Sequence, residues 1–167
     1  TLVSAGAPAL TPNAWNHIAF VRNGTVTRAY TNGVQGSTTG AVGTNALNDS
    51  VNVMTIGRLG NYAALYFNGY ISNLRVVKGT CLYPNGTTFT PSATPLIAVT
   101  NTVLLTCQSS RFLDNSSNAA VVTVGGVPKV SSSNPFNLPA GLVTYGAGYF
   151  NGSSYISTLS NAALAMG

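Results

Sequence analysis

Short apolar runs separated by Gly, Pro and Asn recur along the whole chain, and they predict strands rather than helices. The clearest unit is residues 14–34, where two runs rich in β-branched and aromatic residues flank Asn23-Gly24, a strong hairpin signal. A second turn at Asn32-Gly33 closes this unit. Neither strand alternates cleanly between apolar and polar residues, which is typical of a sheet with one face on a core and the other against loops or a neighbour.

Further strands are expected from the remaining apolar runs. In chain order they lie at residues 1–4, 53–57, 66–77, 102–107 and 142–156. Gly125-Gly126 predicts a second hairpin between residues 119–124 and 128–131. Residues 33–49 are expected to form a surface loop with one weak edge strand, residues 79–95 a turn-rich crossover, and residues 160–165 one short helical turn.

This alternation of strands and turns predicts an all-β fold, a two-sheet antiparallel jelly-roll sandwich with less than about a tenth of its residues in helices. The expected core residues are Trp15, Ile18, Phe20, Ile56, Ile71, Leu74, Val76, Leu104 and Leu105. At 167 residues, the chain is long enough for one domain and a stub of another.

Charge narrows the choice of partners. Charged residues make up only 5% of the chain and the net charge is +5, but the seven Lys and Arg residues are spread along the sequence. Without a basic stripe interleaved with aromatic residues, we expect no nucleic-acid binding, and an acidic surface glycan such as lipopolysaccharide is the better polyanion partner. No apolar run approaches the ~18 residues that span a bilayer, so we expect no membrane insertion.

The sequence contains few of the residues that usually act as catalytic acids and bases. Asp49 and Asp114 are the only carboxylates, and they lie on separate predicted loops, whereas glycoside hydrolysis needs a facing pair. His17 is the only histidine, and its place within a strand beside Trp15 favours a structural imidazole over a catalytic base. We therefore expect that the chain is not an enzyme.

The two cysteines, Cys81 and Cys107, are too few for a disulfide framework. We expect two free, buried thiols, with a bridge between them as the alternative.

Several motifs resemble one family. They are Trp15-x-His17-Ile18-Ala19-Phe20-x-Arg22-Asn23-Gly24-Thr25, Tyr30-x-Asn32-Gly33, Thr55-Ile56-Gly57-Arg58, the run from Phe67 to Val76, and Leu104-Leu105-Thr106-Cys107-Gln108 leading to Arg111-Phe112-x-Asp114-Asn115-Ser116. These motifs resemble the laminin-G-like branch of the concanavalin A-like lectin/glucanase superfamily, most closely the domains repeated in bacteriophage tail and virion-surface proteins. The resemblance spans about three quarters of the chain and implies the same sandwich fold.

The same resemblance implies domain boundaries. Domains of this kind open with a strand similar to Gly148-Tyr149-Phe150-Asn151-Gly152-Ser153-Ser154-Tyr155-Ile156. Residues 1–138 then correspond to the later part of one laminin-G-like sandwich, and residues 139–167 to a connector and the opening strand of the next. We expect strands from neighbouring polypeptide, in the same chain or another subunit, to complete the fold.

Two ligand sites are considered. Many laminin-G-like domains bind calcium at a loop rim, and the oxygen ligands here would come from Asn48, Asp49, Asp114 and Asn115. The alternative is that these four residues only cap turns. No other cofactor is expected. For carbohydrate, an aromatic platform with polar neighbours would consist of Arg58, Asn61, Tyr62 and Tyr66, with Tyr83 as a second position. Strand packing is the alternative role of these aromatic residues.

Two functions remain. The first is a non-enzymatic structural module of a bacteriophage virion (tail, fibre or capsid decoration), located at the virion surface, in contact with other virion subunits or laminin-G-like domains and weakly attached to a host glycan. The second is a carbohydrate-binding lectin or adhesin domain of a bacterial surface protein.

Overall fold

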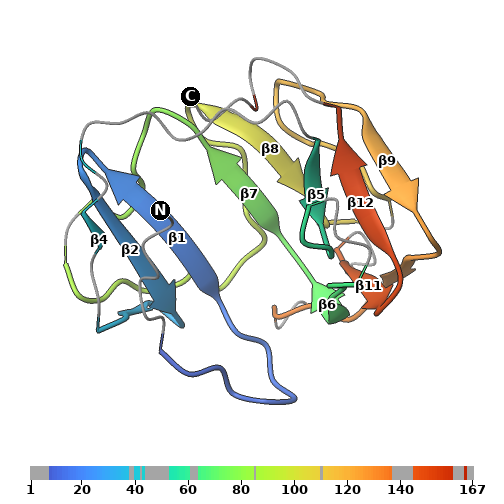
Figure 1. Cartoon of the computed structure of the whole chain (residues 1–167), viewed down its shortest axis with the longest axis horizontal. Coiled ribbons are helices and arrows are strands. Elements are labelled where there is room, and N and C mark those ends of the chain that lie inside the picture. The colour runs from blue at the N-terminus through green and yellow to red at the C-terminus, as the bar shows by residue number, and fades with distance from the viewer. Residues whose placement is uncertain are drawn as a thin grey trace. The chain divides into compact units, whose positions relative to one another are not determined.

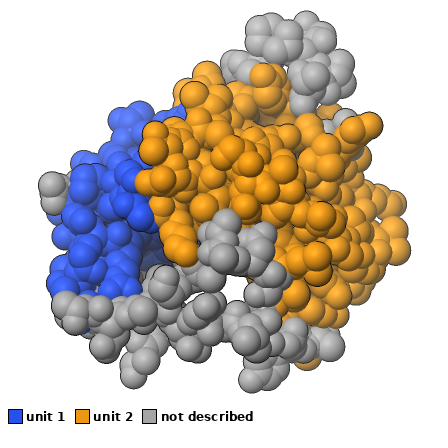
Figure 2. Space-filling view, turned by 90° about the horizontal axis from the view of Figure 1, so that it is seen from above, with its two compact units in different colours: residues 1–47, 79–92 blue, residues 48–78, 93–167 orange. Residues whose placement is uncertain are grey.

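A computed structural model describes residues 8–37, 40–41, 43, 53–60, 64–84, 86–109, 111–136, 145–159 and 164. Every regular element in this part of the chain is a β-strand and all pairings are antiparallel, as the sequence predicted and consistent with a concanavalin A-like sandwich. The chain forms two compact units (Figure 2). Unit 1 comprises residues 1–47 and 79–92, and unit 2 comprises residues 48–78 and 93–167.

Unit 1 holds one four-stranded sheet, with strands β1 (Ile18–Asn23), β2 (Val26–Thr31), β3 (Val34–Gln35) and β4 (Gly40–Ala41). β2 lies between β1 and β3 and also pairs with β4. Both predicted turns form. The first has Gly24 (φ 58°) and Thr25 at its tip, one residue later than the dipeptide suggested, because Asn23 still pairs with Val26. Glycine at the first tip position is typical of a type II′ turn.

The second turn places Asn32 and Gly33 both at positive φ, 51° and 78°, as a type I′ hairpin requires. Gly33 is also fixed by its surroundings. A Cβ at this position would lie 1.9 Å from the carbonyl oxygen of Phe89, whose backbone N–H donates to the oxygen of Gly33. This contact joins the hairpin to the predicted turn-rich crossover, residues 79–95, whose described part holds bends and one isolated bridge, from Thr88 to Val34.

The core prediction was wrong for the first strand. Trp15 is 37% exposed, Ile18 43% and Phe20 77%. Successive strand residues point to opposite faces, so Ala19 shares a face with its partner Tyr30, which is buried, whereas Phe20 projects to the other face. The partners of Phe20 and Ile18 on β2, Ala29 and Thr31, are nevertheless buried, because β2 lies inside the sheet and β1 at its edge. Bulk and β-propensity identified the strand but not its edge position.

Unit 2 holds the other eight strands. They are β5 (Met54–Ile56), β6 (Asn68–Ile71), β7 (Leu74–Val77), β8 (Thr102–Thr106), β9 (Val122–Gly125), β10 (Lys129–Ser131), β11 (Ala147–Asn151) and β12 (Tyr155–Thr158). In Figure 1, β12 lies between β5 and β9, and β7 lies beside β8. A third sheet has the order β10-β11-β6.

Two strand predictions in unit 2 need correction. The run 66–77 is not one strand, because Asn73 adopts φ 55° and separates β6 from β7, which belong to different sheets. The hairpin across Gly125-Gly126 does not form either. β9 pairs with β12 and β10 pairs with β11, so this segment and residues 147–158 run antiparallel and both change sheet at a corner, with Gly126 and Gly152 at positive φ.

The predicted strand at residues 1–4 and helical turn at 160–165 fall outside the described residues, apart from Leu164. The predicted boundary between residues 138 and 139 stays a prediction. Within the chain, β11 and β12 are the middle strands of two sheets of unit 2.

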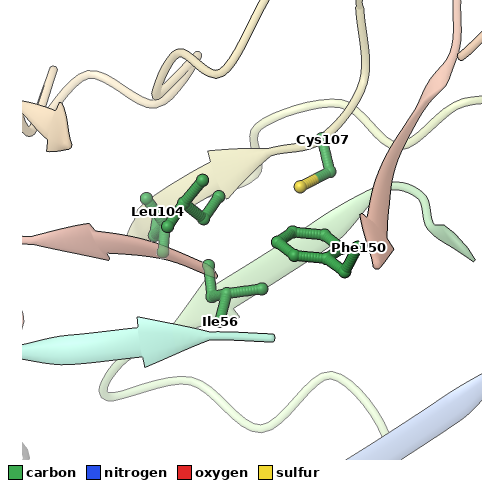
Figure 3. Packing of buried hydrophobic residues seen from close by; sticks show 5 residues of the cluster. Ile56, Leu104, Cys107 and Phe150 are labelled. Carbon is green, nitrogen blue, oxygen red and sulfur yellow. The ribbon is translucent and has the colours of Figure 1, made fainter. Parts of the chain in front are cut away.

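The core of unit 2 is built from alternate residues of several strands. Ile56, Leu104, Cys107, Phe150 and Ile156 are buried, with Ile71, Leu74 and Val76 partly buried against them. In Figure 3, the labelled side chains point toward one another, with the Phe150 ring among them. These burials, together with that of Leu105, confirm the rest of the predicted core.

Candidate functional site

The loop between β5 and β6 folds back on itself and brings two predicted site residues together. Arg58 and Tyr66 form an isolated antiparallel bridge, flanked by backbone hydrogen bonds from Leu59 to Leu65 (3.0 Å) and from Phe67 to Gly57 (2.9 Å). Directly paired residues project to the same face, so the guanidinium and the phenol are neighbours.

A third residue, Tyr155 of β12, completes this cluster. The Arg58 guanidinium carbon lies 3.7 Å from the centroid of the Tyr155 ring, and the rings of Tyr66 and Tyr155 are 6.4 Å apart and tilted by 45°. We term Arg58, Tyr66 and Tyr155 the arginine–tyrosine cluster. A guanidinium held over an aromatic face is stabilised by the ring quadrupole and loses less rotational freedom when it binds a ligand.

Glycine at position 125 makes this stack possible. Gly125 lies directly opposite Tyr155, and a Cβ there would come within 2.2 Å of the phenol ring. The ring therefore lies flat over the edge strand β9, an arrangement in which an aromatic residue covers a glycine. The cluster is thus layered as glycine backbone, tyrosine ring and guanidinium. The Arg58 Nε atom is buried and makes no hydrogen bond to the described residues.

The other predicted carbohydrate residues do not join the cluster. Asn61 and Tyr62 lie outside the described residues. Tyr83 belongs to unit 1, where it stacks on Phe89 with ring centroids 3.7 Å apart and planes within 9°. Tyr30 meets Phe89 edge-on at 5.1 Å and donates from its hydroxyl to the carbonyl of Gly86. Tyr83 is therefore part of the packing that covers β2.

Asp114 is held entirely by protein donors. Its Oδ1 accepts from the backbone N–H groups of Leu105 and Ser116, both at 2.9 Å. Its Oδ2 accepts from the Ser116 hydroxyl (2.9 Å) and from the backbone N–H of Ala120 (2.8 Å). The carboxylate thus anchors the loop after β8 to that strand, and we term it the Asp114 clasp.

The Asp114 clasp leaves neither carboxylate oxygen free for the predicted calcium ion. A calcium ion at Asp114 would have to displace the donors that occupy both carboxylate oxygens. Asn48 and Asp49 lie outside the described residues. Within the part of the chain that the structure describes, no three His, Cys, Asp or Glu residues gather where a metal could be held.

The remaining reactive side chains have structural surroundings. The His17 ring meets Phe89 edge-on at 5.5 Å, and the backbone N–H of His17 donates to the Asn32 side chain at 2.8 Å. Cys81 and Cys107 are both free thiols, so the disulfide alternative was wrong, but Cys81 is only half-buried. Burial raises the pKa of the Cys107 thiol from 9.0 to about 12, which keeps it protonated and unreactive at neutral pH.

Sequence reasoning missed Tyr155, because it was assigned to the opening strand of a following domain. The signal for it was present as alternation: Ile156 and Thr158 are buried, so Tyr155 and Ser157 occupy the opposite face. The cluster can bind a ligand through stacking and guanidinium donors.

Comparison with known proteins agrees with the all-β architecture. No described helix has the length and apolar character needed to cross a membrane. No curated protein matched the chain, and no solved structure matched it. One family model, Laminin_G_3, described as the Concanavalin A-like lectin/glucanases superfamily, matches residues 2–82, a segment that contains β1 to β7. Over this segment, just under half of the 167 residues, the chain is similar to the concanavalin A-like lectin/glucanase superfamily.

Proposed function

We propose that the chain is a non-enzymatic structural module of a bacteriophage virion, exposed at the particle surface and capable of weak attachment to a host glycan. A domain of this superfamily is compatible with a structural or a carbohydrate-binding role. The virion setting rests on the resemblance of its motifs to repeated tail and surface domains. Its partners would be other virion subunits or neighbouring laminin-G-like domains.

The observation that carries the non-enzymatic part is the Asp114 clasp. The chain has only two carboxylates, and a glycosidase of the usual kind needs two that face each other across the sugar. One of the two, Asp114, has both oxygens occupied by four donors and serves the fold. Asp49 alone cannot supply both the acid and the nucleophile or base.

The test is incubation of residues 1–167 with bacterial polysaccharides, followed by measurement of new reducing ends. We expect no release above the buffer control over a day at micromolar protein. Sustained release that disappears in the Asp49→Asn variant would overturn the non-enzymatic role. Asp114→Asn is less informative alone because the substitution also weakens the loop, so folding of each variant is checked by circular dichroism.

A lectin or adhesin domain is the second candidate, and the arginine–tyrosine cluster favours it. Glycan sites combine a stacking aromatic surface with a few oriented polar groups. Tyr66 offers the aromatic ring, and Arg58, held in place by stacking on Tyr155, offers the polar group. A glycan array with the isolated chain distinguishes the two. Selective, submicromolar binding that is lost in Arg58→Gln would favour the lectin, whereas weak or absent binding would favour the structural module.

A further inference from the structure

A row of three side chains crosses the β10-β11-β6 sheet of unit 2. The antiparallel register places Lys129 opposite Tyr149, and Tyr149 opposite Tyr70. Directly paired residues on neighbouring strands project to the same face. We term Lys129, Tyr149 and Tyr70 the tyrosine row.

The tyrosine row lies on the face away from the core. Phe150 and Ile71, the residues next to Tyr149 and Tyr70, belong to or pack against the buried cluster, and successive strand residues point to opposite faces. Tyr70 is 47% exposed, Tyr149 is half-buried and Lys129 is exposed. The row therefore presents adjacent aromatic side chains and a cation on one face of the sheet.

The geometry of the row suits a chain of sugar rings. The two tyrosine rings have centroids 5.1 Å apart and are tilted by 41°, so they form a continuous aromatic surface across two strands. The next pair along the same face is Asn151 opposite Asn68, both exposed. Stacking surfaces beside amide donors and acceptors are what the apolar faces and hydroxyl groups of a sugar require.

The positive charge at the end of the tyrosine row favours an acidic sugar over a neutral one. Lys129 ends the row, and the chain carries seven Lys and Arg residues against two Asp. Asp114, the one acidic residue in the described part of the chain, has both carboxylate oxygens bonded elsewhere. The row therefore presents a cation without an acidic counterpart from the described residues, and a ligand that supplies carboxylates complements it.

We propose that the tyrosine row binds an acidic polysaccharide, with sugar rings stacked on Tyr70 and Tyr149 and a carboxylate paired with Lys129. The site is separate from the arginine–tyrosine cluster, and it rests on the non-enzymatic attachment role proposed above. It assigns that attachment to a sheet face and its ligand to the uronate-bearing class.

Lysine footprinting on the unmodified chain tests the proposal directly. The probe is soluble polygalacturonate, with dextran as the neutral counterpart, and acetylation of the only two lysines, Lys129 and Lys78, is followed by mass spectrometry. We expect polygalacturonate to slow acetylation of Lys129 at least fivefold relative to Lys78, and dextran to have no effect. Equal rates at Lys129 with and without polygalacturonate would overturn the proposal.

Affinity electrophoresis in polygalacturonate gels tests the named residues. Tyr70→Ala and Tyr149→Ala are expected to weaken binding at least tenfold, and Lys129→Gln severalfold. Arg111→Gln, which removes the same charge from an exposed position, should stay within twofold of the unmodified chain. If the two groups of variants weaken binding equally, attraction is only a net-charge effect and the row is refuted.

The outcomes also separate this proposal from the broader function. New reducing ends in the polymer would contradict the non-enzymatic role. An intact polymer that leaves Lys129 unprotected would contradict only the tyrosine row. The Tyr70→Phe and Tyr149→Phe variants keep the rings and the sheet pairing, and they should bind within threefold of the unmodified chain; a loss as large as that of the alanine variants would refute stacking as the mode of binding.

Discussion

Removal of the Asp114 carboxylate is expected to destabilise the fold in a graded way. In Asp114→Asn, the retained oxygen still accepts from Leu105 and Ser116, and the Ser116 hydroxyl can turn to accept from the new amide. The Ala120 N–H, however, would face an N–H group and lose its acceptor. One unsatisfied, partly buried donor costs about 1–3 kcal/mol, which is the expected loss of unfolding free energy.

Asp114→Ala removes all four acceptor interactions and leaves three backbone N–H groups to find water. Because water reaches a half-buried loop, the costs do not simply add, and we expect a loss of about 3–5 kcal/mol. Urea unfolding at pH 7, followed by far-ultraviolet circular dichroism, measures both variants. Asn134→Ala is the control. Its side chain accepts a hydrogen bond from the backbone of Phe136 at 2.9 Å and donates one to the carbonyl of Ser132 at 3.0 Å, and its loss should cost about 1 kcal/mol or less. Asp114→Ala within about 0.5 kcal/mol of the unmodified chain would refute the clasp as a stabilising element.

Three further predictions concern packing, turns and ionisation. Phe150→Ala should lower the unfolding free energy by about 3–5 kcal/mol because the ring is fully buried, whereas Phe20→Ala, at a ring 77% exposed, should change it by less than about 1 kcal/mol in the same urea titration. Gly24→Ala should cost about 1 kcal/mol through its positive φ alone, and Gly33→Ala more than about 2 kcal/mol, since its Cβ would also meet a carbonyl oxygen at 1.9 Å. Burial raises the pKa of the Cys107 thiol from 9.0 to about 12, so between pH 9 and 12 the thiol ionises in the unfolded chain but not in the fold. The stability linked to this thiol is therefore complete below pH 9 and is lost as the pH rises through that window. The urea midpoint of Cys107→Ala should fall less over the same window than that of the unmodified chain.

Each comparison has a contrary outcome. Equal losses for the two phenylalanine variants would mean that the exposed ring of Phe20 is a core residue after all. Equal losses for the two glycine variants would show that the close carbonyl approach at Gly33 is not a constraint. A urea midpoint that falls as steeply in Cys107→Ala as in the unmodified chain would assign the alkaline instability to other groups.

The sequence was sufficient to predict features formed by residues close together in the chain, such as turns and single buried strands. The turns before and after β2 follow from residues that accept positive φ, Gly24 in the first and Asn32 with Gly33 in the second. The buried strand β8 follows from its continuous apolar run. The Gly125-Gly126 hairpin failed for the opposite reason. Turn chemistry fixes that the chain bends there, but the partners of β9 and β10 are strands further along the chain, and pairing at that distance depends on which faces are buried together.

In the candidate site, too, contacts between residues close in the sequence could be predicted, and contacts that depend on distant strand pairing could not. The proximity of Arg58 and Tyr66 could be predicted because one short loop joins their strands, and the Asp114 to Ser116 contacts are a local turn that caps itself. Tyr155 reaches Arg58 only through the pairing of β12 with β9 and β5, which no local pattern encodes. The face of a strand that stays exposed could be read from alternation only after its buried partner was known.

We propose that this chain is a structural component of a virion. This proposal is tested most directly by quantitative mass spectrometry of peptides from residues 1–167 in density-purified bacteriophage particles that carry the gene. A virion component should be found in several copies per particle, in a fixed ratio to a major virion protein, and should be retained through high-salt washing. Absence of these peptides from particles, with recovery in the envelope fraction of a bacterial cell instead, would contradict the proposal.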